Sequence, residues 1–166
     1  MQDATLLLVD GMAAVYRAFF AIKNLSRSDG QPTNAIFGFI RMMDQLVKIW
    51  RPTHLVVVFD GGLPPERLEL VPEYKANRAS MPDEMRSQLE GINSYLSAAA
   101  IPSVCLDACE ADDVMATLAA QASASQARVL LATHDKDLFQ LVDEQTRIVP
   151  VAGHAEAMGP EEIEAK

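Results

Sequence analysis

The sequence is poor in cysteine and has no long apolar run, and both absences narrow its class. Its 166 residues include only two cysteines, Cys105 and Cys109, which form neither a disulfide framework nor a zinc ligand set. No apolar run approaches the length of about 18 residues that a membrane helix needs, and the first residues lack the basic start of a signal peptide. We therefore expect a soluble, cytoplasmic protein whose cysteines stay reduced.

Positive charge is also scarce. Lys and Arg number 14 against 23 Asp and Glu, which gives a net charge of -9 at pH 7. A general polyanion-binding surface normally carries an excess of basic residues, so this balance argues against one. The objection weakens if the surplus acid is gathered at a metal site, because bound cations then become the largest local charges.

Short runs rich in Val and Leu occupy residues 5–9, 55–59, 103–106 and 128–133, with a fifth candidate at 146–151. Helical patterns separate these runs, as in a single α/β domain whose parallel strands are buried on both faces. Acidic residues follow four of the runs: Asp10; Asp60; Glu110 with Asp112 and Asp113; and Asp135 with Asp137. Since open α/β sheets bind ligands at the carboxyl ends of their strands, we expect these acids to converge on one crevice.

Clustered carboxylates of this kind favour a metal site. Several carboxylates within a few ångströms cannot all stay ionised without a cation, and oxygen-only ligand sets select hard ions such as Mg²⁺ or Mn²⁺. The helix dipole offers a simpler explanation for Glu110, Asp112 and Asp113 at a helix start, but it does not cover the acids after the other strands. Spacing does not show whether Asp112 or Asp113 points inward, because neighbours on a helix diverge by about 100°.

The segments between the runs predict helices over residues 34–50 and 82–100, a helix that begins at the 110–113 acids, and a short helix over 138–142. Asn34 is expected to cap the first of these. Residues 61–80 contain several glycines and prolines and predict a long loop without regular structure, of a kind that is usually functional or mobile. Residues 152–166 are too few to form a domain.

Cations and one aromatic residue in the 61–80 segment are candidates for contacts with nucleic acid. Arg67, Lys75 and Arg78 could bind phosphate or stabilise a transition state, and Tyr74 could stack on a base. An ordinary solvated loop would have a similar composition, so the alternative of surface charges without a function stays open.

Two further residues lie near the acids in sequence. Arg17 is bracketed by aromatic residues shortly after Asp10 and is either a half-buried, paired arginine or a phosphate clamp. His134 precedes Asp135 and could ligate a metal or carry a proton, although a lone histidine more often bonds to a backbone carbonyl.

A set of motifs resembles one known family. The motifs are Leu8-Val9-Asp10-Gly11, Tyr16-Arg17-Ala18-Phe19, residues 30–35, 37–39 and 52–54, Val58-Phe59-Asp60, the run Pro-Glu-Tyr-Lys-Ala-Asn-Arg at 72–78, Met81-Pro82, and residues 110–114 and 135–138. In this order they resemble the 5′-nuclease domain of bacterial DNA polymerase I, a family related to flap endonucleases that shares the PIN-like fold. The run at 72–78 is the most specific part of the match, which extends over nearly the whole chain.

The resemblance implies a three-layer PIN-like domain, residues 1–166, in which residues 61–80 form a mobile arch over the active site. It implies hydrolysis of DNA phosphodiesters near 5′ ends, flaps or junctions with two Mg²⁺ or Mn²⁺ ions. One ion would be held by Asp10, Asp60, Glu110 and Asp112 or Asp113, and the other by Asp135 and Asp137. Asp10, Arg17, Arg67 and Lys75 would be catalytic, and Arg17, Tyr74, Lys75 and Arg78 would contact DNA.

The same resemblance predicts the partners and the place of this domain in a longer protein. The expected partners are DNA with a 5′ flap or 5′ end and a DNA polymerase, fused or separate, with no membrane association. Family members continue into a helical module that clamps duplex DNA and supplies further acid to the second metal. Residues 152–166 are therefore expected to be the start of a module that this chain lacks, which would leave the second metal short of ligands.

Two other functions stay open. A PIN-type ribonuclease shares the arrangement of acids but does not need the long segment of cations, and it would cleave RNA in preference to flap DNA. A non-catalytic fragment that only binds nucleic acid would show binding without cleavage.

Overall fold

The computed structural model describes residues 4–71, 73, 80–153 and 156–165. In this part of the chain five strands form one parallel sheet in the order β3-β2-β1-β4-β5. The strands are β1 (Thr5–Asp10), β2 (His54–Phe59), β3 (Ser103–Cys105), β4 (Arg128–Ala132) and β5 (Thr146–Val149). Each Val- and Leu-rich run is therefore a strand, including the fifth candidate.

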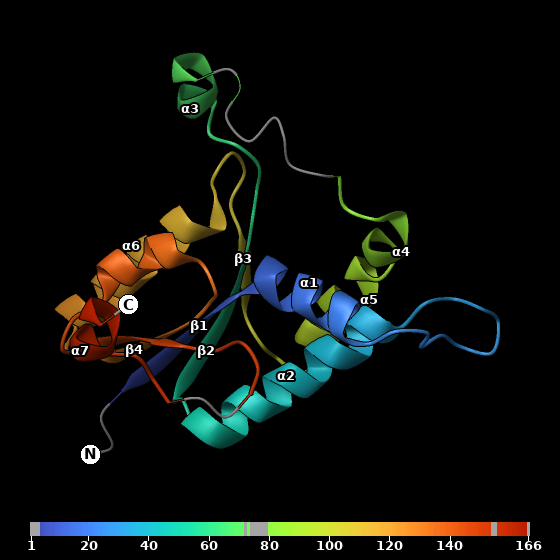
Figure 1. Cartoon of the computed structure of the whole chain (residues 1–166), viewed down its shortest axis with the longest axis horizontal. Coiled ribbons are helices and arrows are strands. Elements are labelled where there is room, and N and C mark those ends of the chain that lie inside the picture. Colours follow the sequence, from blue (N-terminus) through green and yellow to red (C-terminus); the bar gives the residue numbers. More distant parts are fainter. Residues whose placement is uncertain (1–3, 72, 74–79, 154–155, 166) are drawn as a thin grey trace.

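Helices cover both faces of this sheet, which confirms the expected three-layer α/β architecture (Figure 1). One face carries α1 (Gly11–Ala21), α2 (Asn34–Trp50) and α5 (Leu89–Ala98), and the other carries α6 (Ala111–Ala124). The shorter helices are α3 (Pro65–Leu70), α4 (Asp83–Arg86), the 3₁₀ helix η1 (Lys136–Leu141) and α7 (Pro160–Glu164).

The central strand β1 shows why the runs are apolar throughout. Successive side chains of a strand point to opposite faces. Leu7 and Val9 accordingly pack among the side chains of α1, α2 and α5, whereas Leu8 packs against α6. All three side chains are fully buried. A strand covered on both faces needs a continuous apolar run, and this is the pattern of the sequence.

The strand register brings the predicted acids to one edge of the sheet. Asp10, the last residue of β1, lies opposite Val58 of β2, and Val9 lies opposite Ala132 of β4. Because all pairs are parallel, the carboxyl ends of these strands share an edge. Asp60 follows β2 by one residue and Asp135 follows β4 by three, so the chain turns away from the sheet close to both.

Three predicted segments differ from the structure. Residues 61–80 were expected to lack regular structure, but Pro65 begins the six-residue helix α3, a position where its missing N–H costs nothing. The single helix expected over 82–100 is two helices, α4 and α5, because the chain turns at Ser87 and Gln88. The short helix expected over 138–142 is the 3₁₀ helix η1.

A buried glutamine explains the break between α4 and α5. The Gln88 side chain is 1% exposed, and its Oε1 accepts hydrogen bonds from the backbone N–H groups of Ala35 (2.8 Å) and Ile36 (3.3 Å) at the start of α2. Its Nε2 donates to Oδ1 of Asn34 (2.9 Å) and to the carbonyl of Glu84 (3.0 Å). A glutamine from a distant segment therefore satisfies the first N–H groups of α2.

Asn34 has a different role from the predicted one. The residue that precedes α2 is Thr33, and Asn34 is the first residue of the helix. The Asn34 side-chain amide donates to the carbonyls of Phe19 (2.8 Å) and Ile22 (2.9 Å) at the end of α1. Asn34 thus joins α1 to α2 and, through Gln88, both helices to the α4–α5 turn.

Cys105 and Cys109 are not joined in a disulfide. The Sγ of Cys105 donates a weak hydrogen bond of 3.4 Å to the carbonyl of Asp60. None of the helices in the described ranges is long and apolar enough to cross a membrane.

We predict that Gln88→Ala lowers the free energy of unfolding by about 2 to 4 kcal/mol, because it leaves buried donors and an acceptor of α2 unsatisfied. Thermal or urea unfolding followed by circular dichroism would measure the change. Gln121→Ala, at an exposed site on α6, is the matched control and should change stability by less than about 0.5 kcal/mol. Equal stability of the two variants would contradict the proposed role of Gln88.

Candidate functional site

A cavity of about 670 Å³ opens at the carboxyl edge of the sheet. Its acidic lining residues are Asp10, Asp60, Glu110, Asp112 and Asp135. A neighbouring cavity of about 490 Å³ is lined by Asp112, Asp113 and Asp137 together with Arg67 and Lys136. The seven predicted acids therefore gather around two adjoining cavities, which share Asp112.

The end of β1 fixes the position of Asp10. Its Oδ1 accepts a hydrogen bond of 2.9 Å from the N–H of Ala13, so Asp10 caps the start of α1. Its Oδ2 accepts a hydrogen bond of 3.2 Å from the hydroxyl of Thr133. Burial raises the pKa of Asp10, and the charges of Asp60 and Asp135 raise it further, while these two hydrogen bonds act in the opposite direction.

A close backbone approach fixes Asp60. The next residue, Gly61, lies so near the loop after β3 that a Cβ atom would stand 1.7 Å from the carbonyl oxygen of Leu106. The N–H of Gly61 donates to the carbonyl of Cys109 (2.9 Å). Oδ1 of Asp60 then accepts a hydrogen bond of 3.1 Å from the N–H of Ala111, so the end of β2 is held against the start of α6.

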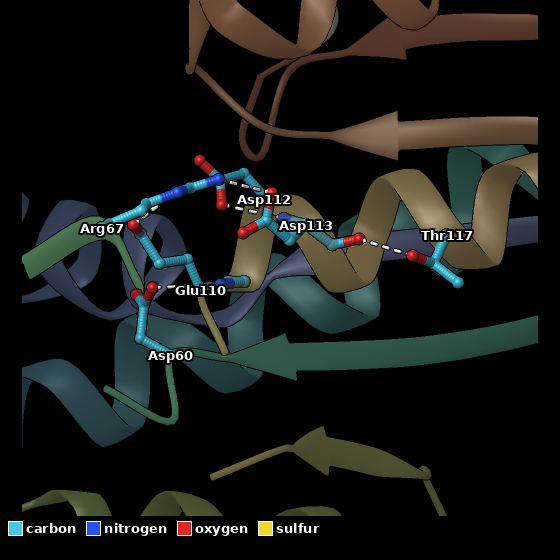
Figure 2. A network of polar contacts seen from close by, with 7 residues as sticks. Asp60, Arg67, Glu110, Asp112, Asp113 and Thr117 are labelled. Carbon is cyan, nitrogen blue, oxygen red and sulfur yellow. Dashed lines mark hydrogen bonds and ion pairs between the residues drawn. The ribbon is translucent and has the colours of Figure 1, made fainter. Parts of the chain in front are cut away.

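Arg67 of α3 reaches into the acids at the start of α6 (Figure 2). Its Nη1 lies 2.5 Å from Oε1 of Glu110, and its Nη2 lies 2.8 Å from Oδ1 of Asp113. The side chain of Glu110 is 1% exposed, whereas that of Asp113 is 49% exposed. The guanidinium thus joins a buried carboxylate to a surface one, and the reading of Arg67 as an ordinary solvated charge is wrong.

The segment after β4 places the last two acids. Thr133 is buried, and its Oγ1 accepts a hydrogen bond of 3.0 Å from the N–H of Asp135. Oδ1 of Asp135 accepts one of 2.9 Å from the N–H of Asp137 and so caps η1. Sequence reasoning missed Thr133, which connects Asp10 to this segment. The signal for Thr133 in the sequence was its position, as a polar residue at the end of an apolar run.

His134 and Arg17 lie beside the acids. His134 is exposed and lines a separate cavity of about 750 Å³, and it is not among the residues that line the first cavity. Partial burial of its imidazole, and then the charge of Arg17, lower the pKa of His134. Arg17 is exposed on α1 and forms no ion pair with any residue in the described ranges, so the half-buried, paired alternative is wrong.

Three of the predicted DNA contacts, Tyr74, Lys75 and Arg78, fall outside the described residues. The structure therefore adds nothing to the prediction for these three side chains. Among the predicted cations, the structure places Arg17 and Arg67.

The acids fit a divalent metal in chemistry but not in their present arrangement. Their donor atoms are all carboxylate oxygens, the ligands that Mg²⁺ and Mn²⁺ prefer. Across the described residues, however, no three His, Cys, Asp or Glu side chains are close enough to hold an ion as they stand. Arg67 binds Glu110 and Asp113, and backbone or hydroxyl donors bind Asp10 and Asp60, so side chains must rotate before a metal can bind.

The raised pKa of Asp10 predicts that Asp10→Asn stabilises the protein in EDTA at neutral pH. A carboxyl group whose pKa is raised in the folded state stabilises the fold at pH values below its ordinary pKa of 3.8. This contribution is lost as the pH rises through the raised pKa. Asparagine removes the charge and keeps an oxygen for Ala13, so Asp10→Asn should melt higher than wild type at pH 7.

The difference in Tm should narrow as the pH approaches 4, because wild-type Asp10 then becomes protonated. Asp44→Asn, at an exposed site on α2, makes the same chemical change away from the acids and serves as the control. A lower Tm for Asp10→Asn at pH 7 would show that its hydrogen bonds outweigh the cost of the buried charge.

Sequence comparison identifies relatives among bacterial nucleases and polymerases. Residues 5–166 match the family described as 5′-3′ exonuclease, N-terminal resolvase-like domain. The DNA polymerase I of Pseudomonas aeruginosa is 44% identical over 149 residues, which cover 90% of this chain and 16% of that protein. The 5′-3′ exonuclease of Aquifex aeolicus is 44% identical over 145 residues, which cover 87% of this chain and 50% of that protein. The chain spans half or less of the length of these relatives.

Solved structures share the fold at lower identity. The bacteriophage T5 D15 flap endonuclease, in a complex with DNA and metal ions, matches with a TM-score of 0.66 and 24% identity, over 88% of this chain and 54% of that one. At this identity the likeness concerns the fold alone. The family match is different, because it extends over almost every residue from β1 onwards. The chain therefore belongs to the family of 5′-3′ exonuclease N-terminal, resolvase-like domains.

Proposed function

We propose that this chain is a metal-dependent 5′-nuclease domain that hydrolyses DNA phosphodiesters near a 5′ end, flap or junction. The observation that carries the proposal is the convergence of Asp10, Asp60, Glu110, Asp112 and Asp135 on one cavity at the carboxyl edge of the sheet. Relatives named 5′-3′ exonuclease and DNA polymerase I support DNA as the substrate.

The proposed cofactor is a pair of Mg²⁺ or Mn²⁺ ions. Asp10, Asp60, Glu110 and Asp112 or Asp113 would hold the first, and Asp135 and Asp137 the second. When bound, such ions activate a water for attack and stabilise the leaving oxygen of an in-line displacement. Related structures that contain metal ions support a divalent metal in general.

The remaining roles belong to the side chains around the acids. Asp10 and Asp135 share Thr133 as a hydrogen-bonding partner, which joins the end of β1 to the segment after β4. Arg17 has an exposed guanidinium near this edge and would contact a substrate phosphate. Lys75, Tyr74 and Arg78 would contact the 5′ strand from the 61–80 segment, on the basis of the sequence alone.

The wider setting is part of the same proposal. The partners would be DNA with a 5′ end or flap and a DNA polymerase, since relatives of this chain carry that name. Residues 1–166 would form one nuclease domain, with 152–166 leading into a further helical module, because the relatives are longer. We place the activity in the cytoplasm, by analogy with the bacterial relatives named DNA polymerase I.

A cleavage assay with a 5′-labelled DNA flap, in Mg²⁺, Mn²⁺ or EDTA, tests the proposal. We expect cleavage with either metal and none in EDTA. Asp60→Asn and Asp135→Asn should each reduce the rate by more than about 100-fold, beyond the 10 to 100-fold typical of residues that only support a metal ligand. Asp44→Asn on α2 should cleave like wild type.

The same assay separates the alternative functions. A matched RNA strand that is cleaved faster than the DNA flap would favour a PIN-type ribonuclease. Binding of the flap without cleavage, in both metals, would favour a fragment that only binds nucleic acid and would overturn the proposed activity.

A further inference from the structure

Helix α3 stands apart from the sheet, and Arg67 is the residue that ties it to the acids. In Figure 1 the helix lies at the top of the molecule, beyond the carboxyl ends of the strands. Its end is exposed to solvent, with Leu70 83% and Val71 53% exposed. Among the described residues, both ion pairs that join α3 to the start of α6 are made by Arg67.

The contact with Glu110 is more than a surface ion pair. Surface pairs contribute little, about 0 to 1 kcal/mol, because water screens both charges. The Glu110 carboxylate is buried, however, and a buried charge needs a cation or several hydrogen bonds close by. The guanidinium can bridge two carboxylates at once, since its N–H groups point in fixed directions.

We propose that Arg67 is an internal counter-ion that competes with divalent metal for Glu110 and Asp113, so that metal binding releases α3 from α6. The proposal rests on the metal-dependent function proposed above. It assigns Arg67 a role in the metal-free protein, in addition to any later contact with substrate.

The geometry makes the two cations compete. Oε1 of Glu110 lies 2.5 Å from the guanidinium, so an ion that takes this oxygen as a ligand must displace Nη1 or turn the carboxylate away. A divalent ion also repels a guanidinium a few ångströms away. The exchange keeps Glu110 next to a positive charge in both states, which a buried carboxylate requires.

Competition of this kind works in both directions. If metal binding weakens the hold of Arg67 on α6, then Arg67 weakens the binding of metal by the same factor. Release of α3 would leave the guanidinium free to turn towards an incoming phosphate. Metal loading and the position of α3 would then be linked through two carboxylates.

Metal binding to the free protein tests this link without any substrate. Calorimetric titration of wild type and Arg67→Gln with Mn²⁺ alone should show binding that is on the order of tenfold tighter in the variant. Arg86→Gln removes the same charge at an exposed site on α4 and should bind Mn²⁺ like wild type. Equal affinity of wild type and Arg67→Gln would contradict the competition.

Hydrogen exchange provides the second readout, at the amides of residues 69–71 in and after α3. In wild type these amides should exchange faster after Mn²⁺ is added, because α3 loses its contact with α6. In Arg67→Gln they should already exchange fast in EDTA and change little with Mn²⁺. Exchange that is unaffected by Mn²⁺ in wild type would overturn the release of α3.

The outcomes separate this proposal from the one on which it rests. Absence of Mn²⁺ binding to wild type would remove the metal site itself, whereas binding without any effect of Arg67 would remove only the counter-ion role. If Arg67→Gln does not fold in EDTA, Arg67→Lys replaces it. Lysine keeps the charge but cannot bridge both carboxylates, so intermediate Mn²⁺ affinity is expected, and wild-type behaviour in both measurements would overturn the proposal.

Discussion

The parallel pairing of β1 with β2 on one side and β4 on the other is the constraint on which the rest of the structure depends. It places three strand ends at one edge of the sheet, where β1 ends in Asp10, Asp60 follows β2 by one residue and Asp135 follows β4 by three. The pairing is stable because apolar side chains of β1 are buried on both faces, by α1 and α2 on one side and α6 on the other. Hydrophobic burial thus stabilises an arrangement of charges that would repel one another if they were brought together alone.

The chain limits this repulsion with contacts of its own. Asp10 and Asp60 accept hydrogen bonds from the first turns of α1 and α6, and Arg67 supplies a positive charge beside Glu110. These contacts hold the carboxylates at the edge of the two cavities, and within the described part of the chain no three of them are arranged to hold an ion. The fold therefore fixes where the site lies. The exact arrangement of the ligands depends on what binds there.

Much of the fold and of the acidic edge could be predicted from the sequence, because both depend on local patterns. The apolar runs marked the strands, and the acids that follow them marked the edge. What could not be predicted depends on contacts between residues far apart in the chain. Gln88 caps a helix that starts more than fifty residues earlier, and Arg67 binds Glu110, which is 43 residues later. Nothing near Gln88 in the sequence distinguishes it from a surface residue, and the sequence marked Arg67 as a cation of interest without showing that it binds Glu110 and Asp113.

Helices α3 and α4 follow one another along the chain, and each is held by a different kind of contact. Near α4, Gln88 is held by neutral hydrogen bonds in the interior, where dissolved ions do not reach. In α3, the pair of Arg67 with the half-exposed Asp113 is open to screening by salt, whereas its pair with the buried Glu110 is screened much less. A rise in ionic strength therefore weakens the hold on α3 and leaves the hydrogen bonds that hold α4 unchanged.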